Sequence, residues 1–341
     1  MSRDAYTIVV DILRRQKGDA TFREYERHLR QYRDWIHDEG KSVWEASPVD
    51  IRYMVDAMID EGYSASSINV RYAALGEFYD RAQIQQHEGN VPDFENPMED
   101  APTLRDWDHI KSEQKRKKRT SKDDVPYLEP DAVRKLARNV ASPTVRNECM
   151  IRLAVGTGLR RGELVRLKLS DGTWTADNPE TFSEGPPREI QVRAEVAKNG
   201  ERRKIGWPKD ARLDTILKRW IEDYRPTVSM ASRSEYLFPS NRSEHISGQA
   251  FNDAVKEAAE NAGIQQVQMV NKAGEERQAV TAHVLRHTFA MRCINAGWDI
   301  YALSSALGHS SVEVTEQNYL HDAEEVVLDH FRNEGPKFGT N

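Results

Sequence analysis

Residues 282–320 read AHVLRHTFAMRCINAGWDIYALSSALGHSSVEVTEQNYL, and this stretch decides how the whole chain is interpreted. His283 and Arg286 stand three positions apart, so on a helix they share one face. His309 follows in a Gly-His turn, and Tyr319 comes after it. The stretch therefore supplies cations and hydrogen-bond donors for an anion, together with one candidate nucleophile.

The start of this helix is a natural position for a phosphate. Thr281 precedes the helix and is expected to cap it, which leaves backbone N–H groups and the positive end of the helix dipole beside His283 and Arg286. The stretch has no cluster of carboxylates that would hold magnesium. The pattern indicates phosphate chemistry that proceeds without a metal.

Length and composition indicate a protein of two domains inside the cell. The chain has 341 residues, enough for two hydrophobic cores. It has no apolar run long enough for a membrane span and no signal peptide, so we expect a soluble cytoplasmic protein. Its two cysteines, Cys149 and Cys293, are expected to be buried thiols, which argues against a disulfide framework or a cysteine metal site.

Charge is distributed unevenly along the chain. The net charge is −6 overall and −8 over residues 1–100, so the remainder is slightly basic. Residues 111–122 read KSEQKRKKRTSK, with seven cations and one glutamate. Such a run is either a solvated linker or a contact for DNA phosphates. The candidate DNA-binding residues are Lys115, Arg116, Lys117, Lys118 and Arg119.

Hydrophobic spacing predicts a helical N-terminal part and a mixed C-terminal part. Helical patterns cover residues 5–33 with a break near Gly18, and then residues 48–60 and 64–84, where tryptophans and tyrosines are expected to pack in the core. A polar, proline-bearing segment follows. The predicted organisation is a helical DNA-binding domain at 1–95, a basic interdomain linker at 96–122, a catalytic domain that breaks and rejoins DNA at 123–332, and a tail at 333–341.

Within the C-terminal part, a strand pair interrupts the helices. Alternation predicts strands at 188–194 and 202–207, and Asn199-Gly200 is a strong hairpin signal, which places Lys198 at the hairpin tip. The expected fold class is mainly α with a small antiparallel β-sheet. The predicted helices lie at 129–140, 144–155, 160–167, 209–224, 247–262 and within 282–330.

Two arginines are suited to a phosphodiester under attack by an oxygen nucleophile. Negative charge then grows on the non-bridging oxygens, and planar guanidiniums can clamp them with paired hydrogen bonds. Arg160, which opens a helix after a glycine turn, and Arg286 are the candidates. Glu163, three residues after Arg160, is expected to be its ion-pair partner and to orient an arginine or histidine.

The remaining groups would move protons. Tyr319 is the only tyrosine after His309, and its phenol must lose a proton when it attacks. Neutral His283 can accept that proton, Lys198 can deliver one to the leaving sugar oxygen, and His309 can donate to a phosphate oxygen.

Each of these residues also has a simpler interpretation. A lone arginine or lysine is usually a surface charge, and a lone histidine or tyrosine usually caps or packs. His283 and His287 with His309 could bind zinc, but Arg286 between them would repel a cation, and HVLRH lacks the glutamate of HExxH enzymes. The joint occurrence of the set favours phosphate chemistry.

These residues closely resemble the tyrosine recombinase family, the phage-integrase and Xer-like enzymes. The matching segments are GTGLRRGEL with Arg160, AKNGERRKIGWP with Lys198, HVLRH with His283 and Arg286, LGH with His309, and then Tyr319, and LFPS at residues 237–240 falls where the family often has a similar loop. The resemblance covers residues 123–330. The N-terminal helices resemble the family's SAM-like core-binding domain in placement and type only.

The resemblance implies a clamp around double-stranded DNA and a site-specific recombinase. Tyr319 would form a 3′-phosphotyrosine bond, with no metal, ATP or other cofactor needed, and the working unit would be a homotetramer on two DNA sites. Residues 323–331 would dock into a neighbouring subunit. Two departures are the acidic N-terminal part and the nine residues between His309 and Tyr319, one more than in most of the family. The alternative is a catalytically silent DNA-binding protein that keeps this fold.

Overall fold

The chain divides into two compact units, residues 1–121 and 122–341. The structure is a computed structural model that describes residues 4–108, 110–112, 127–174, 188–207, 210–270, 276–309, 311 and 315. In the described part, no helix combines the length and the apolar character that crossing a membrane requires. Each unit has a hydrophobic core of its own.

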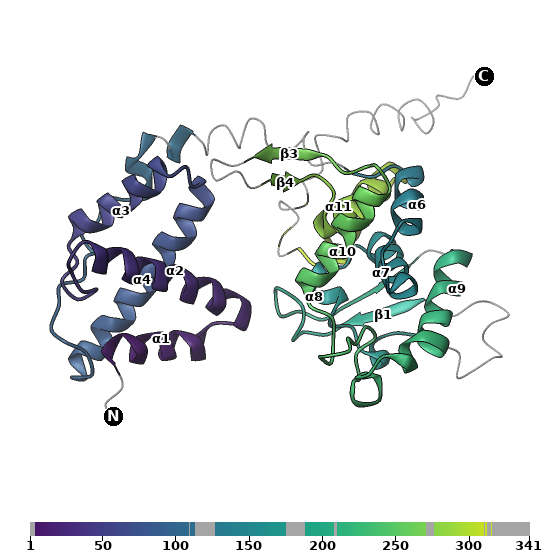
Figure 1. Cartoon of the computed structure of the whole chain (residues 1–341), viewed down its shortest axis with the longest axis horizontal. Coiled ribbons are helices and arrows are strands. Elements are labelled where there is room, and N and C mark those ends of the chain that lie inside the picture. Colours follow the sequence, from purple (N-terminus) through teal and green to yellow (C-terminus); the bar gives the residue numbers. More distant parts are fainter. Residues whose placement is uncertain are drawn as a thin grey trace, which may run out of the picture. The chain divides into compact units, whose positions relative to one another are not determined.

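The long helices in the described part of the first unit pack as a bundle (Figure 1): α1 (Ala5–Gln16), α2 (Asp19–Asp38), α3 (Pro48–Asp60) and α4 (Ala65–His87). Gly18 separates α1 from α2, as the sequence predicts. Ser47 and Asp50 form a capping box that starts α3, with Pro48 at its first position. The Ser64 hydroxyl accepts from the Ser67 N–H at 3.2 Å and starts α4.

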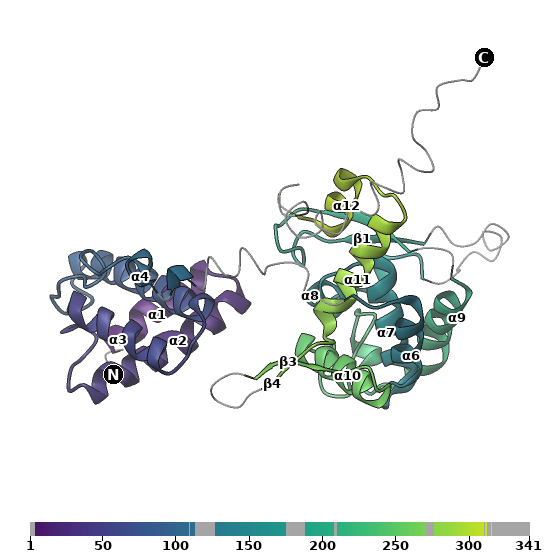
Figure 2. The same cartoon turned by 90° about the horizontal axis from the view of Figure 1, so that it is seen from above.

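The core of this unit forms where α1 and α2 pack on α4. Phe78 and Tyr79 are fully buried on α4, and the Tyr79 hydroxyl donates to the carbonyl of Val43 at 2.7 Å. Tyr32 of α2 is also buried and lies within hydrogen-bond distance of Tyr79, so these aromatic residues are core residues as expected. Figure 2 shows the same bundle turned by 90°.

Part of the segment assigned to the linker belongs to this unit. Met98, Leu104 and Trp107 pack against the N-terminal core, and the Trp107 indole N–H donates to Asp56 Oδ1 at 2.7 Å. The prolines of this segment prevent long helices, as expected. Its apolar side chains nevertheless pack against the hydrophobic core of the first unit. Of the remaining linker residues, 109 and 113–122 lie outside the described residues.

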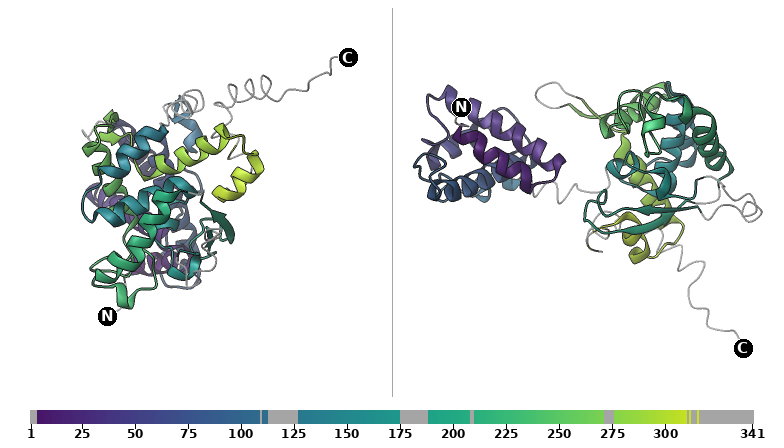
Figure 3. Two further views of the ribbon diagram at one scale, coloured as in Figure 1. Left: turned by 90° about the vertical axis from the view of Figure 1, so that its right-hand side faces the viewer. Right: turned by 90° about the horizontal axis from the view of Figure 1, so that it is seen from below.

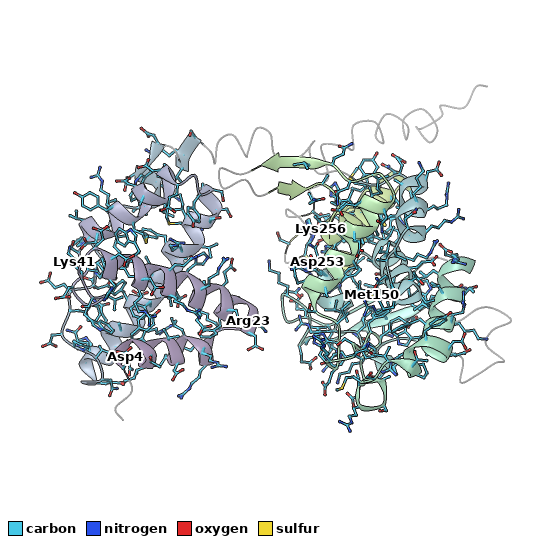
Figure 4. All side chains as sticks on the ribbon, viewed as in Figure 1. Asp4, Arg23, Lys41, Met150, Asp253 and Lys256 are labelled. Atoms are coloured by element: carbon cyan, nitrogen blue, oxygen red, sulfur yellow. The ribbon has the colours of Figure 1, made fainter. Side chains whose placement is uncertain are left out.

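The second unit surrounds α7 (Thr144–Thr157), whose residues are buried on nearly all sides. Helices α6 (Pro130–Arg138), α9 (Ala211–Arg219), α10 (Gly248–Asn261) and α11 (Ala282–Asn295) pack on α7 (Figure 1). Figure 3 gives two further views of the chain. Met150, labelled in Figure 4, is fully buried at the centre of this core. Cys149 and Cys293 are buried free thiols, in agreement with the sequence analysis.

The described part of this unit also contains short hairpins and short helices. Strand β1 (Glu189–Val192) pairs antiparallel with β2 (Arg203–Gly206), so that Val192 faces Arg203. Strand β3 (Val267–Val270) pairs antiparallel with β4 (Glu276–Gln278), a hairpin that the sequence analysis did not predict. The short helices are α8 (Arg161–Leu164) and α12 (Ile300–Leu307). The prediction of a mainly helical fold with a small antiparallel sheet is confirmed.

The predicted hairpin is present, with shorter strands than expected. The predicted strands leave residues 195–201 between them, whereas residues 193–202 separate the observed strands. Gly200 does adopt the left-handed conformation, with φ +71°. Lys198 lies exposed within this connection.

Candidate active site

Arg160 is positioned by the end of one helix and the start of the next. Gly158 ends α7 in the left-handed conformation, with φ +64°, which a glycine adopts without strain. The chain then turns, and Arg160 becomes the first residue before α8. Its backbone N–H donates to Glu163 Oε2 at 2.9 Å, its Nη1 donates to Glu163 Oε1 at 3.1 Å, and its Nη2 donates to the Gly308 carbonyl at 2.7 Å.

Arg286 reaches the same place from α11. Its side chain is buried, at 4% exposure, and its two terminal nitrogens donate to the carbonyls of Gly158 and Leu307, each at 2.7 Å. Arg160 bonds the carbonyl of Gly308, which adjoins Leu307. Bonds to consecutive carbonyls bring the two guanidiniums together, as the sequence predicts.

His309 lies beside these arginines because α12 ends immediately before it. Gly308 caps α12 with φ +64°, and the His309 backbone N–H returns to the Ser304 carbonyl at 3.1 Å. The imidazole Nδ1 is 2.6 Å from the Thr315 hydroxyl. Burial, followed by the positive charges of Arg286, Arg160 and Arg203, lowers the pKa of His309 to about 4. The ring is therefore neutral at pH 7.

The expected ion pair between Arg160 and Glu163 is present, and a further arginine joins it. Arg203, at the start of β2, donates to both Glu163 oxygens, at 3.1 and 2.6 Å. The Glu163 side chain is 1% exposed, and that of Arg203 is 8% exposed. The sequence analysis assigned no role to Arg203. From the motif AKNGERRKIGWP alone, this arginine would be interpreted as a surface charge. Its partner Glu163 is identified only in the folded structure.

The other predicted site residues either have exposed side chains or lie outside the described residues. His283 is exposed in the first turn of α11, one turn before Arg286. Lys198 is exposed between β1 and β2. Tyr319 and the cations Lys115, Arg116, Lys117, Lys118 and Arg119 lie outside the described residues.

The expected cap of α11 is made by another residue. Thr281 occupies the capping position but makes no side-chain capping bond. Instead, Asn252 on α10 reaches across and accepts from the Ala282 N–H at 3.1 Å. The prediction that Thr281 caps the helix is wrong in detail, because a tertiary contact replaces the local one.

The chemistry of this arrangement follows from its charges. Arg160, Arg203 and Arg286 carry three positive charges around the carboxylate of Glu163 and the neutral ring of His309. A partly buried excess of guanidinium N–H donors is suited to an anion with several oxygens, such as a phosphodiester. Two guanidiniums with an imidazole can stabilise negative charge that develops on those oxygens.

Comparison with known proteins shows the family of the chain. The chain matches the phage integrase family over residues 126–325 and the phage integrase N-terminal SAM-like domain over residues 10–86. The chain therefore belongs to the phage integrase family. Its fold class, a SAM-like N-terminal domain followed by an integrase domain, is that of the family.

Similar proteins and structures cover almost the whole chain. The tyrosine recombinase XerD of Rhizobium meliloti (strain 1021) is 28% identical over 96% of this chain and 93% of its own length. XerD of Yersinia pestis is 28% identical over 92% of this chain and 90% of its own length.

Solved structures of similar fold include two that are described with DNA. XerH site-specific recombinase bound to difH substrate has a TM-score of 0.61 at 16% identity, covering 94% of this chain and 84% of its own. The Tn1549 transposon integrase with transposon right end DNA has a TM-score of 0.59 at 17% identity, covering 96% of this chain and 99% of its own.

Proposed function

We propose that this protein is a site-specific DNA recombinase that cleaves and rejoins double-stranded DNA through a 3′-phosphotyrosine intermediate, without metal or ATP. The observation that carries the proposal is the convergence of Arg160, Arg286 and neutral His309 around consecutive carbonyls at the end of α12. Its relatives named tyrosine recombinase, together with the DNA-bound structures of similar fold, support the same activity.

In this proposal the two arginines hold the non-bridging oxygens of the phosphodiester. Their charge opposes the negative charge that grows during attack, and their hydrogen bonds to protein carbonyls and Glu163 fix their direction beforehand. His309 is neutral and can carry only one ring proton. When Nδ1 accepts from the Thr315 hydroxyl, that proton lies on Nε2, and in the proposed reaction Nε2 donates it to a phosphate oxygen.

Tyr319, His283 and Lys198 carry out the bond and proton changes of the proposed reaction. The Tyr319 oxygen forms a bond to phosphorus while the bond from phosphorus to the 5′ oxygen breaks. His283 accepts the phenol proton, and Lys198 delivers a proton to the leaving 5′ oxygen. Attack by a 5′ hydroxyl of the partner strand reverses these steps. The phosphotyrosine conserves the bond energy, which is why neither ATP nor a metal takes part.

The proposal extends to the arrangement of the protein on DNA. The SAM-like unit and the basic run at 115–119 would contact DNA, and two DNA sites would be held by a homotetramer. The catalytic steps would take place in the cytoplasm, on chromosomal or mobile DNA. A catalytically silent DNA-binding protein of the same fold is not favoured, because the arginine and histidine cluster is assembled with its hydrogen bonds in place.

The direct test is to trap a covalent complex. Duplexes selected for tight binding are given a nick close to the cleaved phosphate, so that the released fragment diffuses away and cleavage cannot reverse. The wild-type protein should form a complex that survives denaturing electrophoresis, and Tyr319→Phe should form none. Identical behaviour of the two proteins would refute the enzyme proposal, and relaxation of supercoiled plasmid without any cofactor provides a check that needs no selected site.

A further inference from the structure

Arg203 lies near the site and makes several hydrogen bonds, but it has no role in the proposed chemistry. Its Nη1 and Nη2 donate to the two oxygens of Glu163, at 3.1 and 2.6 Å, and its Nε donates to the Ala306 carbonyl at 3.0 Å. Paired bonds of this kind fix direction as well as distance. One guanidinium therefore connects β2 to α8 and to the last turn of α12.

Glu163 passes this constraint on to Arg160. The carboxylate receives Arg203 on one side and the backbone N–H and Nη1 of Arg160 on the other. Burial opposes its ionisation, but the hydrogen bonds and charge of Arg203, followed by those of Arg160, lower the pKa of Glu163 below its ordinary value. A buried carboxylate without Arg203 would keep only Arg160 as a partner, and its ionised form would become costly.

Arg203 also packs against the turn that carries His309. A Cβ atom at Gly308 would lie 2.8 Å from Arg203 Nη1 and 2.9 Å from Cζ, so the guanidinium fills the space beside that glycine. In the β1–β2 ladder, Arg203 faces Val192, at the base of the connection in which Lys198 lies. Arg203 thus touches the supports of Arg160 and His309 and stands where the Lys198 connection rejoins the sheet.

We propose that Arg203 is a positioning residue for strand cleavage, which holds Glu163 so that the Arg160 guanidinium points at the scissile phosphate and the His309 turn stays in place. The proposal rests on the recombinase function proposed above. It predicts a defect in the chemical step with DNA binding preserved, because the Arg203 side chain is buried against Glu163 and its Nε, Nη1 and Nη2 each already bond to Ala306 or Glu163.

The experiment compares Arg203→Gln and Arg203→Lys with Arg202→Gln, which changes the exposed neighbouring arginine. Single-turnover cleavage at saturating protein and DNA affinity are measured for each variant. Outer partners that orient a catalytic group typically contribute about 10- to 100-fold. Arg203→Gln should lower the cleavage rate by about that factor with DNA affinity within about twofold, and Arg203→Lys should recover part of the loss. A rate equal to that of Arg202→Gln would overturn the proposal.

A double-mutant comparison separates positioning from general loss of folding. If Arg203 acts through Glu163 on Arg160, then Arg203→Gln should cost much less in an Arg160→Lys background than in the wild type. Independent, multiplicative losses would overturn the proposal. Absence of cleavage by the wild type on the same DNA would refute the proposed recombinase function, whereas wild-type cleavage with an unimpaired Arg203→Gln would refute only the role of Arg203.

The pH profile supplies a readout that a purely structural role would not shift. His309 faces the charges of Arg286, Arg160 and Arg203 and bonds to Thr315. Arg203 lowers the pKa of Glu163 and also that of His309, so removing its positive charge should raise both pKa values and move the acid limb of the cleavage profile to higher pH in Arg203→Gln. The limb should stay at its wild-type position in Arg202→Gln. An unmoved limb in Arg203→Gln would contradict the placement of Arg203 beside the His309 turn.

Discussion

At the scale of single residues, the site depends on guanidinium geometry more than on charge alone. Arg160 bonds Glu163 and the Gly308 carbonyl at once, and Arg286 bonds two carbonyls at once. A planar fork with several donors can do this, whereas an ammonium group is a compact point charge. The difference between arginine and lysine at these positions is therefore a test of the site.

Arg160→Lys should lower single-turnover strand cleavage by about 10²–10³-fold, the loss typical when a donor to a developing negative charge is removed. The ammonium keeps the charge but cannot reach Glu163, Gly308 and a phosphate together. Arg161→Lys, at the exposed neighbouring position, is the control and should cleave at close to the wild-type rate. Equal rates for the two variants would show that Arg160 does not contact the reacting phosphate.

The neutral state of His309 makes folding stability depend on pH. Its pKa is lowered to about 4 in the folded protein, against about 6.5 in an unfolded chain. Between these values the unfolded state binds the proton more tightly, so this contribution to stability is complete above about pH 6.5 and is lost as the pH falls toward 4. The thermal midpoint of the wild type should therefore fall more steeply between pH 7 and 5 than that of His309→Asn. Parallel curves would contradict a half-buried neutral imidazole.

At the scale of elements, several boundaries follow directly from local sequence. The helix predicted at 48–60 is α3, because Ser47, Pro48 and Asp50 carry a complete start signal. The break after α7 was predicted from its glycines, and Gly158 does adopt a positive φ. Both are local effects, so sequence reasoning reaches them.

Other elements depend on partners far along the chain and could not be predicted. The cap of α11 comes from Asn252, and the role of Arg203 requires Glu163, which lies 40 residues earlier in sequence. The strands β3 and β4 are short, at 4 and 3 residues, with a register irregularity between Val267 and Met269. Such strands lack the sustained alternation that identifies a strand.

Gly158→Ala should destabilise the second unit, since Gly158 combines a positive φ with close packing. A Cβ there would overlap the ring of Phe289, and the left-handed backbone adds strain for any other residue. The expected loss is about 2–4 kcal/mol in the free energy of unfolding, from strain and overpacking together. Gly200→Ala is the matched control, with φ +71° but nothing within 4 Å of its Cβ, and should lose only about 1–2 kcal/mol. Equal losses in denaturant titrations would contradict the close packing at Gly158.

At the scale of the whole molecule, the sequence predicted two units, but the segment between them divides differently. Apolar residues such as Leu104 and Trp107 join the first core, although the segment around them is polar and rich in proline. The surface of the folded unit determines which apolar side chains of a polar segment become buried, so the sequence of the segment alone does not predict them. Arg160, Arg286 and His309 could be predicted as site residues because they lie in recognisable sequence motifs that follow one another in a characteristic order. The direction in which each side chain points could be seen only in the folded structure.

The basic run should govern the salt dependence of DNA binding. Removing one cation that binds a phosphate reduces the steepness of log affinity against log salt by about 0.9. Replacing Lys115, Arg116, Lys117, Lys118 and Arg119 by glutamine should make that slope shallower by up to about 4.5 and weaken binding to all duplexes alike. Lys218→Gln with Arg219→Gln, at the end of α9, is the control. An unchanged slope in the five-residue variant would show that the run is only a solvated linker.

The central claim is that the cluster of Arg160, Arg286 and His309 directs Tyr319 at a DNA phosphate. The most direct measurement is mass spectrometry of the peptide that remains linked to DNA after trapping and proteolysis, combined with identification of the DNA end released. The account predicts one linked peptide, with a 3′-phosphate on Tyr319 and a free 5′-hydroxyl on the released strand. A link through another residue, or a 5′-phosphate joined to the protein, would contradict it.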